Sequence, residues 1–116
     1  MSFNFDPLVS RIISFRDNRD WKQFHNPKDM AISLQLEAAE FLEHFQWKNE
    51  QEIEEHLLAH KSDVSDELAD VLYWVLLIAS DLDINLVTAL STKMEKNEKK
   101  YPVDKAKGKH TKYTDL

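Results

Sequence analysis

Two apolar stretches decide the fold, MAISLQLEAAEFLEHF at residues 30–45 and VSDELADVLYWVLLIASDL at residues 64–82. In the first stretch, apolar residues occur on nearly every side of a helix, which predicts a helix that is buried all round. In the second, apolar residues recur at steps of three and four, which is the period of an α-helix. The sequence therefore predicts two long core helices.

The N-terminal part of the chain predicts a shorter helix before these two. Asp6-Pro7 has the form of an N-cap followed by proline at the first helical position, so a helix begins there and runs to about Arg16 or Arg19. The stretch that follows has no clean period and ends in a second cap-and-proline signal, Asn26-Pro27. The first core helix therefore starts near Pro27.

Polar helices are predicted between and after the core helices. Residues 50–59 indicate a short surface helix, and residues 61–63 offer new caps for the second core helix. Asp83 is expected to cap a last helix, which ends before Pro102. The lysine-rich residues 103–116 are expected to be extended or poorly ordered.

Composition supports one all-α domain. The chain has 116 residues, 42% of them hydrophobic, with one glycine and three prolines, so few tight turns are available and long helices are favoured. We predict a compact bundle of four to five helices over residues 1–102, with residues 103–116 as a tail. Cysteine is absent, which excludes a disulfide framework, thiolate-held zinc and thiol catalysis, and is compatible with a reducing compartment. We therefore expect a cytoplasmic protein.

The charge pattern and the lengths of the apolar runs argue against two classes of partner. The net charge is −6, and residues 1–92 hold 17 acidic but only seven basic side chains. An acidic body argues against binding a nucleic-acid polymer, because that requires clustered Lys and Arg. The longest uninterrupted apolar run, residues 71–79, is much shorter than the about 20 residues that a membrane-spanning helix needs. We expect neither a nucleic-acid polymer nor a membrane as a partner.

Each core helix carries a pair of acids at its centre. Glu37 and Glu40 are three residues apart, as are Glu67 and Asp70, so each pair shares one face of its helix. Antiparallel packing of the two helices would bring the four carboxylates together in a low-dielectric interior, where they cannot all stay ionised without a cation. Oxygen ligands alone favour a hard ion, so the motif predicts a site for Mg²⁺, or Mn²⁺ in its place.

Two other interpretations of the acids exist, and a separate pair of histidines has metal-ligand spacing. The acids could be ordinary solvated positions, but the residues that flank them are too apolar for an exposed stripe. A di-iron carboxylate bundle would need Glu-x-x-His on two helices, and no histidine lies three residues after a glutamate. His56 and His60 are spaced to hold a metal, but they lie on the polar helix and are interpreted as exposed histidines.

Aromatic and basic residues supply candidates for substrate contacts. Any one of the three tryptophans is most simply a packing residue, and His25 is most simply a cap or surface residue. Trp74 differs because it stands four residues after Asp70 and should approach the acidic cavity. On the last helix, Lys93, Asn97 and Lys100 share a face, which is either solvated or suited to phosphate groups.

Together these motifs resemble a known family, the MazG-like branch of the all-α nucleoside triphosphate pyrophosphohydrolases. The resemblance begins with Glu37-x-x-Glu40 and Glu67-x-x-Asp70, which match the magnesium signature of that family. Further segments are similar to the dCTP pyrophosphatase subgroup. They are Arg19-Asp20-Trp21, Phe24-His25-x-Pro27, Phe45-Gln46-Trp47, Lys93-Met94-x-x-Asn97, Tyr101-Pro102 and Lys112-Tyr113-Thr114-Asp115-Leu116. One position departs from the pattern, because Trp74 stands where the subgroup leads us to expect a tyrosine.

The resemblance implies Mg²⁺-dependent hydrolysis of a deoxynucleoside triphosphate, dCTP or a modified relative, to the monophosphate and pyrophosphate, which would cleanse the nucleotide pool. The four acids would then hold the metal and carry catalysis, with no single general base indicated. The substrate contacts that it implies are Trp21, His25, Trp47 and Trp74 for the base and sugar, and Lys93, Asn97 and Lys100 for the phosphates. Tyr101 is a further implied substrate contact. The alternatives are the same chemistry on dUTP or on a broad or damaged set of triphosphates, and a non-catalytic helical interaction module with a structural ion.

The core helices also predict self-association. Residues 30–45 and 64–82 are apolar on too many faces for the remaining helices of one chain to cover. Closed symmetric homo-oligomers are the usual solution. The resemblance implies a homotetramer built from two dimers, with a dimer as the simpler possibility.

Overall fold

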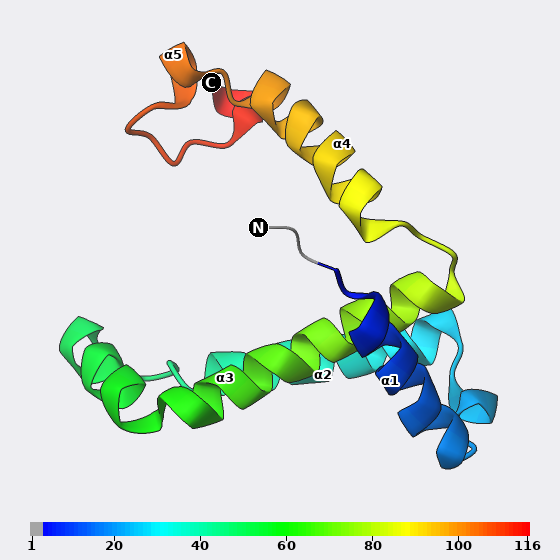
Figure 1. The fold of residues 1–116 in the computed structure, drawn as a ribbon. Helices are drawn as coiled ribbons and strands as arrows, with labels where there is room; N and C mark the ends of the chain where they lie inside the picture. Colours follow the sequence, from blue (N-terminus) through cyan, green and yellow to red (C-terminus); the bar gives the residue numbers. More distant parts are fainter. Residues whose placement is uncertain (1–3) are drawn as a thin grey trace. The chain divides into compact units, whose positions relative to one another are not determined.

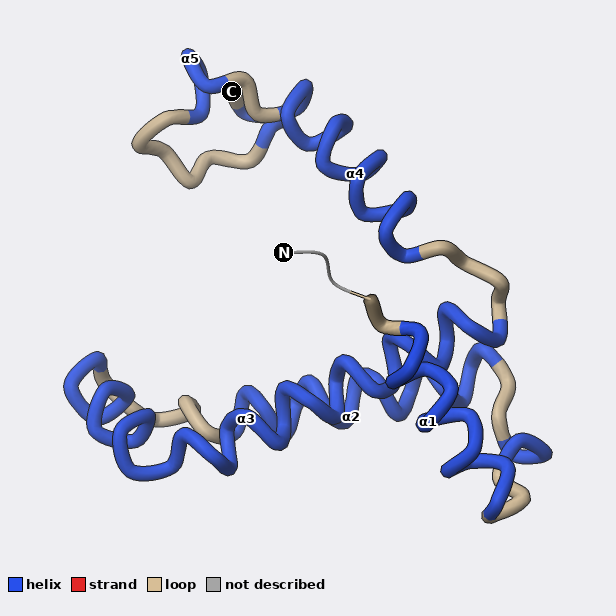
Figure 2. Tube along the Cα trace, in the orientation of Figure 1, coloured by secondary structure: helices blue, strands red, loops and turns tan. Residues whose placement is uncertain are grey.

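The computed structural model describes residues 4–116, so residues 1–3, at the start of the predicted 1–102 domain, lie outside the described residues. Between residues 4 and 116 it contains helices and loops but no strand, which confirms the all-α prediction (Figure 2). The elements are α1 (Asp6–Asn18), the 3-10 turn η1 (Lys22–Phe24), α2 (Pro27–Glu43), α3 (Glu50–Asp81), α4 (Leu86–Lys100), α5 (Val103–Ala106) and the 3-10 turn η2 (Tyr113–Asp115).

The chain divides into two units, one ending at Leu82 and the other beginning at Asp83. In the first unit, α2 lies alongside α3 and the two run in opposite directions, while α1 packs on α3 near its C-terminal end (Figure 1). The buried apolar side chains come from α2 and α3 and are Met30, Val64, Leu76, Leu77 and Ala79. This small core fixes the α2–α3 pair that carries the acidic motifs.

The start of α2 lies where the sequence predicts it. The side chain of Asn26 accepts a hydrogen bond from the backbone N–H of Asp29 at 2.9 Å, and Pro27 is the first helical residue. The start of α1 lies one residue earlier than the sequence predicts. Phe5 occupies the cap position, so the prediction of Asp6 as the cap is wrong. Asp6 lies inside the first turn, where its N–H donates to the Asn4 side chain at 3.0 Å.

The two helices predicted over residues 50–59 and 64–82 are joined in the structure. α3 runs through Lys61, Ser62 and Asp63, which are therefore not caps, and the only break is His60, whose φ of −127° and ψ of 27° are not helical. A capping box starts this long helix, because the Asn49 side chain accepts from the N–H of Glu52 while the Glu52 side chain accepts from the N–H of Asn49. The sequence therefore predicted the position of the discontinuity, but the structure has a kink within one helix where two separate helices were predicted.

The prediction that residues 30–45 are buried all round is wrong for a single chain. Met30 is the only fully buried residue of α2, whereas Ile32, Leu36 and Leu42 are 50%, 60% and 64% exposed. The reason is that α3 covers only one side of α2. A broad apolar face of α2 is therefore left open within one chain.

The second unit consists of α4 and the residues that follow it. Asp83 has a positive φ of 54° and the cap of α4 is Asn85, whose side chain accepts from the N–H of Thr88, so the prediction of Asp83 as the cap is wrong. Residues 103–116 are not merely extended, because they form α5 and η2. The Tyr113 ring lies 6.0 Å from that of Tyr101, measured between centroids, which returns the end of the chain to the end of α4.

No single helix among residues 4–116 is both long enough and apolar enough to cross a bilayer, and α3 and α4 meet those criteria only when they are counted together.

Candidate active site: four carboxylates beside an aromatic cavity

The two acidic motifs meet in the first unit. Glu37 and Glu40 lie one turn apart on α2, and Glu67 and Asp70 lie one turn apart on the adjacent α3. Each of the four offers a carboxylate oxygen, and these oxygens all lie within 4.8 Å of one another. The helix pairing thus assembles the cluster that the spacing of the acids predicts.

Two oxygens of this cluster are buried without a partner. Oε2 of Glu37 and Oε2 of Glu67 are inaccessible to solvent and accept no hydrogen bond from the described residues. A buried polar atom in that state is costly, and more so when it is charged. Glu40 and Asp70, on the outer side of the cluster, are exposed. The arrangement leaves two inner oxygens that a bound cation or a proton would satisfy.

The acid groups perturb one another's ionisation. Burial, hydrogen bonding with Glu40, and repulsion by the other three carboxylates raise the pKa of Glu37 from its ordinary 4.5 to about 7. The pKa of Glu67 is also raised, first by hydrogen bonding with Glu40 and then by burial and its acidic neighbours, while His44 acts in the opposite direction. Four carboxylates with orphaned oxygens and no nitrogen or sulfur donor in the group fit a hard divalent cation.

The raised pKa of Glu37 predicts how metal-free stability depends on pH. A carboxyl whose pKa is higher in the folded state stabilises that state below its unfolded pKa, and this contribution is lost as pH rises through the folded value. We expect metal-free protein to melt at a lower temperature at pH 8 than at pH 5.5, by about 5 °C, the shift that about 1 kcal/mol produces in a domain of this size. Added Mg²⁺ should restore the melting temperature at pH 8.

Differential scanning calorimetry with and without chelator measures this effect. The variant Glu37→Gln should flatten the pH dependence, whereas Glu43→Gln, one turn beyond Glu40 on α2, should leave it as in the wild type. A Glu37→Gln protein with the wild-type slope would contradict the assignment.

An aromatic cavity adjoins the carboxylates. Its volume is about 510 Å³, and both Glu37 and Asp70 contribute to its wall. Trp21 and Trp74 line it. The spacing from Asp70 predicts this position for Trp74, and the substrate contact that the resemblance implies for Trp21 stays a prediction. A flat ring system could stack against such walls while its charged end lies toward the acids.

Several lining residues have no counterpart among the sequence predictions. One face of α1 contributes Leu8, Ile12 and Phe15. Their helical spacing is visible in the sequence, but such spacing indicates a buried helix face and not a substrate site. Phe15 meets Trp21 and Tyr73 edge to face, with centroids 5.6 and 6.3 Å apart. The remaining two are Arg11 and Tyr73, for which the spacing of the acids gives no signal.

Not every predicted substrate residue lies at this cavity. His25 lines a neighbouring cavity, and its ring meets that of Trp74 at 5.3 Å between centroids. Trp47 is 91% exposed, with a positive φ of 69°, and does not line either cavity. The predicted phosphate contacts lie on α4 in the second unit and are Lys93, Asn97 and Lys100, and the further predicted substrate residue Tyr101 directly follows α4. Among them, Lys100 places its Nζ 4.7 Å from the centroid of the Tyr113 ring.

Known proteins are similar to this chain in sequence and fold. A model of the MazG-like family matches residues 32–116, the range that contains all four carboxylates. Over 99% of its length the chain is 33% identical to dCTP pyrophosphatase 1 of Bos taurus and 35% identical to that of Rattus norvegicus, covering 72% and 71% of those proteins. It is also similar to the crystal structure of a pyrophosphatase from Archaeoglobus fulgidus, with a TM-score of 0.82 and 41% identity over 88% of this chain and 95% of that one.

Proposed function

The chain belongs to the MazG-like family and is a nucleotide pyrophosphohydrolase, and from this premise we propose that it hydrolyses dCTP or a modified dCTP to the monophosphate and pyrophosphate with Mg²⁺. The observation that carries the proposal is the set of four carboxylates, with oxygens within 4.8 Å of one another, at the wall of an aromatic cavity. The relatives named dCTP pyrophosphatase 1 support the choice of base. The non-catalytic alternative has no support from the family.

Different residues would contact the triphosphate and the base of the substrate. Glu37, Glu40, Glu67 and Asp70 would hold Mg²⁺, or Mn²⁺ in its place, and the bound ion would neutralise charge on the triphosphate. A carboxylate of the same cluster would accept the proton of the attacking water, in keeping with acids whose pKa is raised toward neutrality. Trp21 and Trp74 would enclose the base, with Arg11 at the cavity wall. Lys93, Asn97 and Lys100 remain proposed phosphate contacts, and Tyr101 remains a proposed substrate contact.

A pyrophosphate-release assay tests the function and the substrate together. We expect dCTP to give the highest kcat/KM among the canonical deoxynucleotides and a panel of damaged ones, and we expect no release in excess chelator. Faster turnover of dUTP, or equal turnover of many triphosphates, would replace dCTP as the substrate while keeping the chemistry. Full activity in chelator would contradict the metal-dependent mechanism. Pool cleansing in the cytoplasm is the proposed setting, in keeping with a chain that has no cysteine.

We further propose that the active form is a homotetramer made of two dimers. Support comes from the open apolar face of α2 with Ile32, Leu36 and Leu42, and from Leu68 on α3, which is 54% exposed. Trp47, exposed in the isolated chain, would then reach a substrate cavity of a neighbouring copy.

Sedimentation equilibrium at micromolar concentration should report four chains, with two as the smaller state, and dilution that dissociates the assembly should reduce activity. The physical reason is that separated chains would return this apolar face to water, at about 25 cal/mol for each Å². A stable monomer with full activity would contradict both the assembly and the contribution of a neighbouring chain to the cavity.

A further inference from the structure

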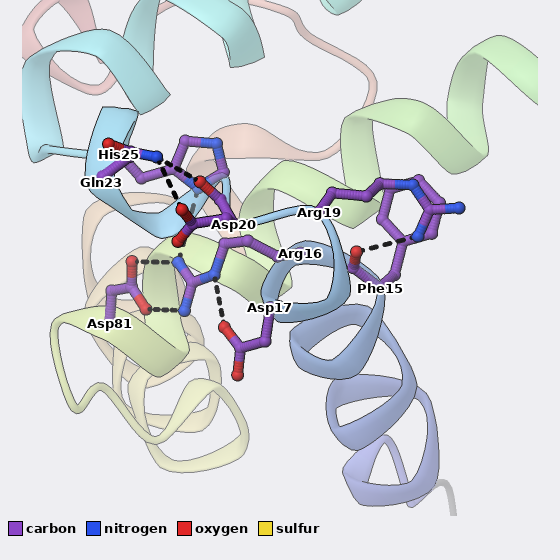
Figure 3. Close-up of polar contacts among 8 residues, drawn as sticks. All are labelled: Phe15, Arg16, Asp17, Arg19, Asp20, Gln23, His25 and Asp81. Carbon is purple, nitrogen blue, oxygen red and sulfur yellow. Dashed lines mark hydrogen bonds and ion pairs between the residues drawn. The ribbon is translucent and has the colours of Figure 1, made fainter.

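Arg16 is the one charged side chain that is buried within residues 4–116, with 2% of its surface exposed. It extends from α1 to the C-terminal end of α3, where Nη1 donates to Oδ2 of Asp81 at 2.7 Å and Nη2 donates to Oδ1 at 2.9 Å (Figure 3). This bidentate ion pair fixes the plane and position of the guanidinium group. Arg16 is therefore a rigid, charged element inside the first unit.

The same guanidinium group faces His25. Nη1 of Arg16 lies 3.5 Å from Nδ1 of the imidazole (Figure 3). Because a guanidinium has only donors, a proton on Nδ1 would point at a cation, and Nδ1 is left as the acceptor. In a neutral ring the proton then resides on Nε2. Arg16 thus selects one of the two tautomers of His25.

His25 in turn touches the aromatic cavity wall. Its ring meets the Trp74 ring edge to face, at 5.3 Å between centroids and 68° between planes. Trp74 lines the cavity beside Glu37 and Asp70. A continuous series of contacts therefore leads from the Arg16–Asp81 ion pair, through His25, to the surface on which a base would stack.

We propose that Arg16, anchored by Asp81, is a positioning residue that fixes His25 as the neutral tautomer protonated on Nε2 and thereby holds Trp74 in the cavity wall. The effect of this arrangement on catalysis rests on the proposed pyrophosphohydrolase function. The tautomer of His25 does not depend on that function. A neutral ring also keeps a second positive charge away from Arg16 and leaves Nε2–H as a donor.

The charges around His25 agree with a neutral ring. Burial and then the positive charge of Arg16 lower the pKa of His25, while Asp81 acts in the opposite direction. His25 lines a cavity of about 460 Å³ together with Arg16 and Asp81, and the other charged residues in its lining are Asp17 from α1 and Lys22 from η1. α2 and the residues just before it contribute only uncharged groups to this lining, including Asn26.

The test compares the wild type with the double variant Arg16→Leu/Asp81→Leu, which removes both charges together and leaves no buried carboxylate unpaired. Nitrogen NMR of the histidine rings should show His25 of the wild type protonated on Nε2. In the double variant we expect a mixture of tautomers and only a small upward shift of the titration midpoint, because burial, the first cause of the lowered pKa, remains and the removed charges of Arg16 and Asp81 act in opposite directions. The KM for dCTP should rise about fivefold to tenfold with kcat nearly unchanged. Arg16→Lys, which keeps a cation near Nδ1, should retain the wild-type tautomer.

The other four histidines are internal controls, and their signals should not move. A wild-type His25 protonated on Nδ1, or the same His25 spectrum in the double variant, would overturn the proposal. A changed His25 spectrum with an unchanged KM would overturn the positioning of Trp74 for substrate. If the wild type released no pyrophosphate from any nucleotide, the proposed function would fail while the NMR result still decided the role of Arg16 toward His25.

Discussion

Glu40→Gln should lower the rate of pyrophosphate release by about a thousandfold, the loss expected when a metal ligand or a proton acceptor is removed. The exposed Glu40 carboxylate is one of the groups that raise the pKa of both inner glutamates, partly through like-charge repulsion. The amide has nearly the same shape, and it removes one like charge from the cluster. Metal-free stability should therefore not fall. A pyrophosphate-release assay, with circular dichroism to check the fold, measures both results.

Asp70→Asn should have the same effect from α3. Its matched control is Asp66→Asn, one turn earlier on the same helix but outside the group of converging oxygens, and this variant should keep wild-type turnover. The second control is Glu43→Gln on α2. Equal activity of Asp70→Asn and Asp66→Asn would show that the carboxylate cluster is not the reaction centre.

Trp74→Ala should reduce kcat/KM for dCTP by about tenfold to a hundredfold, because stacking of a base on an aromatic ring is worth about 1–3 kcal/mol. Trp74 lines the cavity beside Asp70 and is only partly exposed. Trp74→Phe retains a flat ring and should recover most of the loss. Steady-state kinetics on dCTP and on one poor nucleotide measure the effect, which should be larger for dCTP.

A packing role for Trp74 would give a different result. Equal losses on both nucleotides, together with a lower melting temperature, would show that the ring contributes to stability rather than to base binding. Trp74 also meets Tyr73 edge to face, with ring centroids 5.2 Å apart, so we expect Trp74→Ala to lose some stability whichever role the ring has. The comparison between nucleotides, rather than the size of the loss, separates the two roles.

The helical architecture was accessible from the sequence because its signals are local. The Asn26-Pro27 cap and the three- and four-residue apolar steps of residues 64–82 depend on neighbours along the chain, and α2 and the end of α3 follow them. Burial is not local. The apolar residues of α2 predicted a helix covered on all sides, but which of them meet α3 depends on how two distant segments pack, and Leu36 stays exposed.

The same distinction applies to the candidate site. Acid pairs three residues apart must share a helix face, so the convergence of Glu37 and Glu67 needed only that the two helices pair. Arg11 and Tyr73 reach the cavity through the packing of α1 on α3, which no spacing within either helix encodes. The contact between Arg16 and Asp81 spans 65 positions of sequence and was invisible for the same reason.

The kink at His60 decides where this chain can change in length. A helix turns by about 100° per residue, so one residue inserted between the buried Val64 and Glu67 would rotate Glu67 and Asp70 by that angle relative to Val64. One residue inserted before His60 is different, because the non-helical backbone there does not transmit helical phase to the residues that follow. The polar segment at residues 50–59 can therefore grow or shrink over evolutionary time, while the angular setting of the acids on the far side of the kink stays the same.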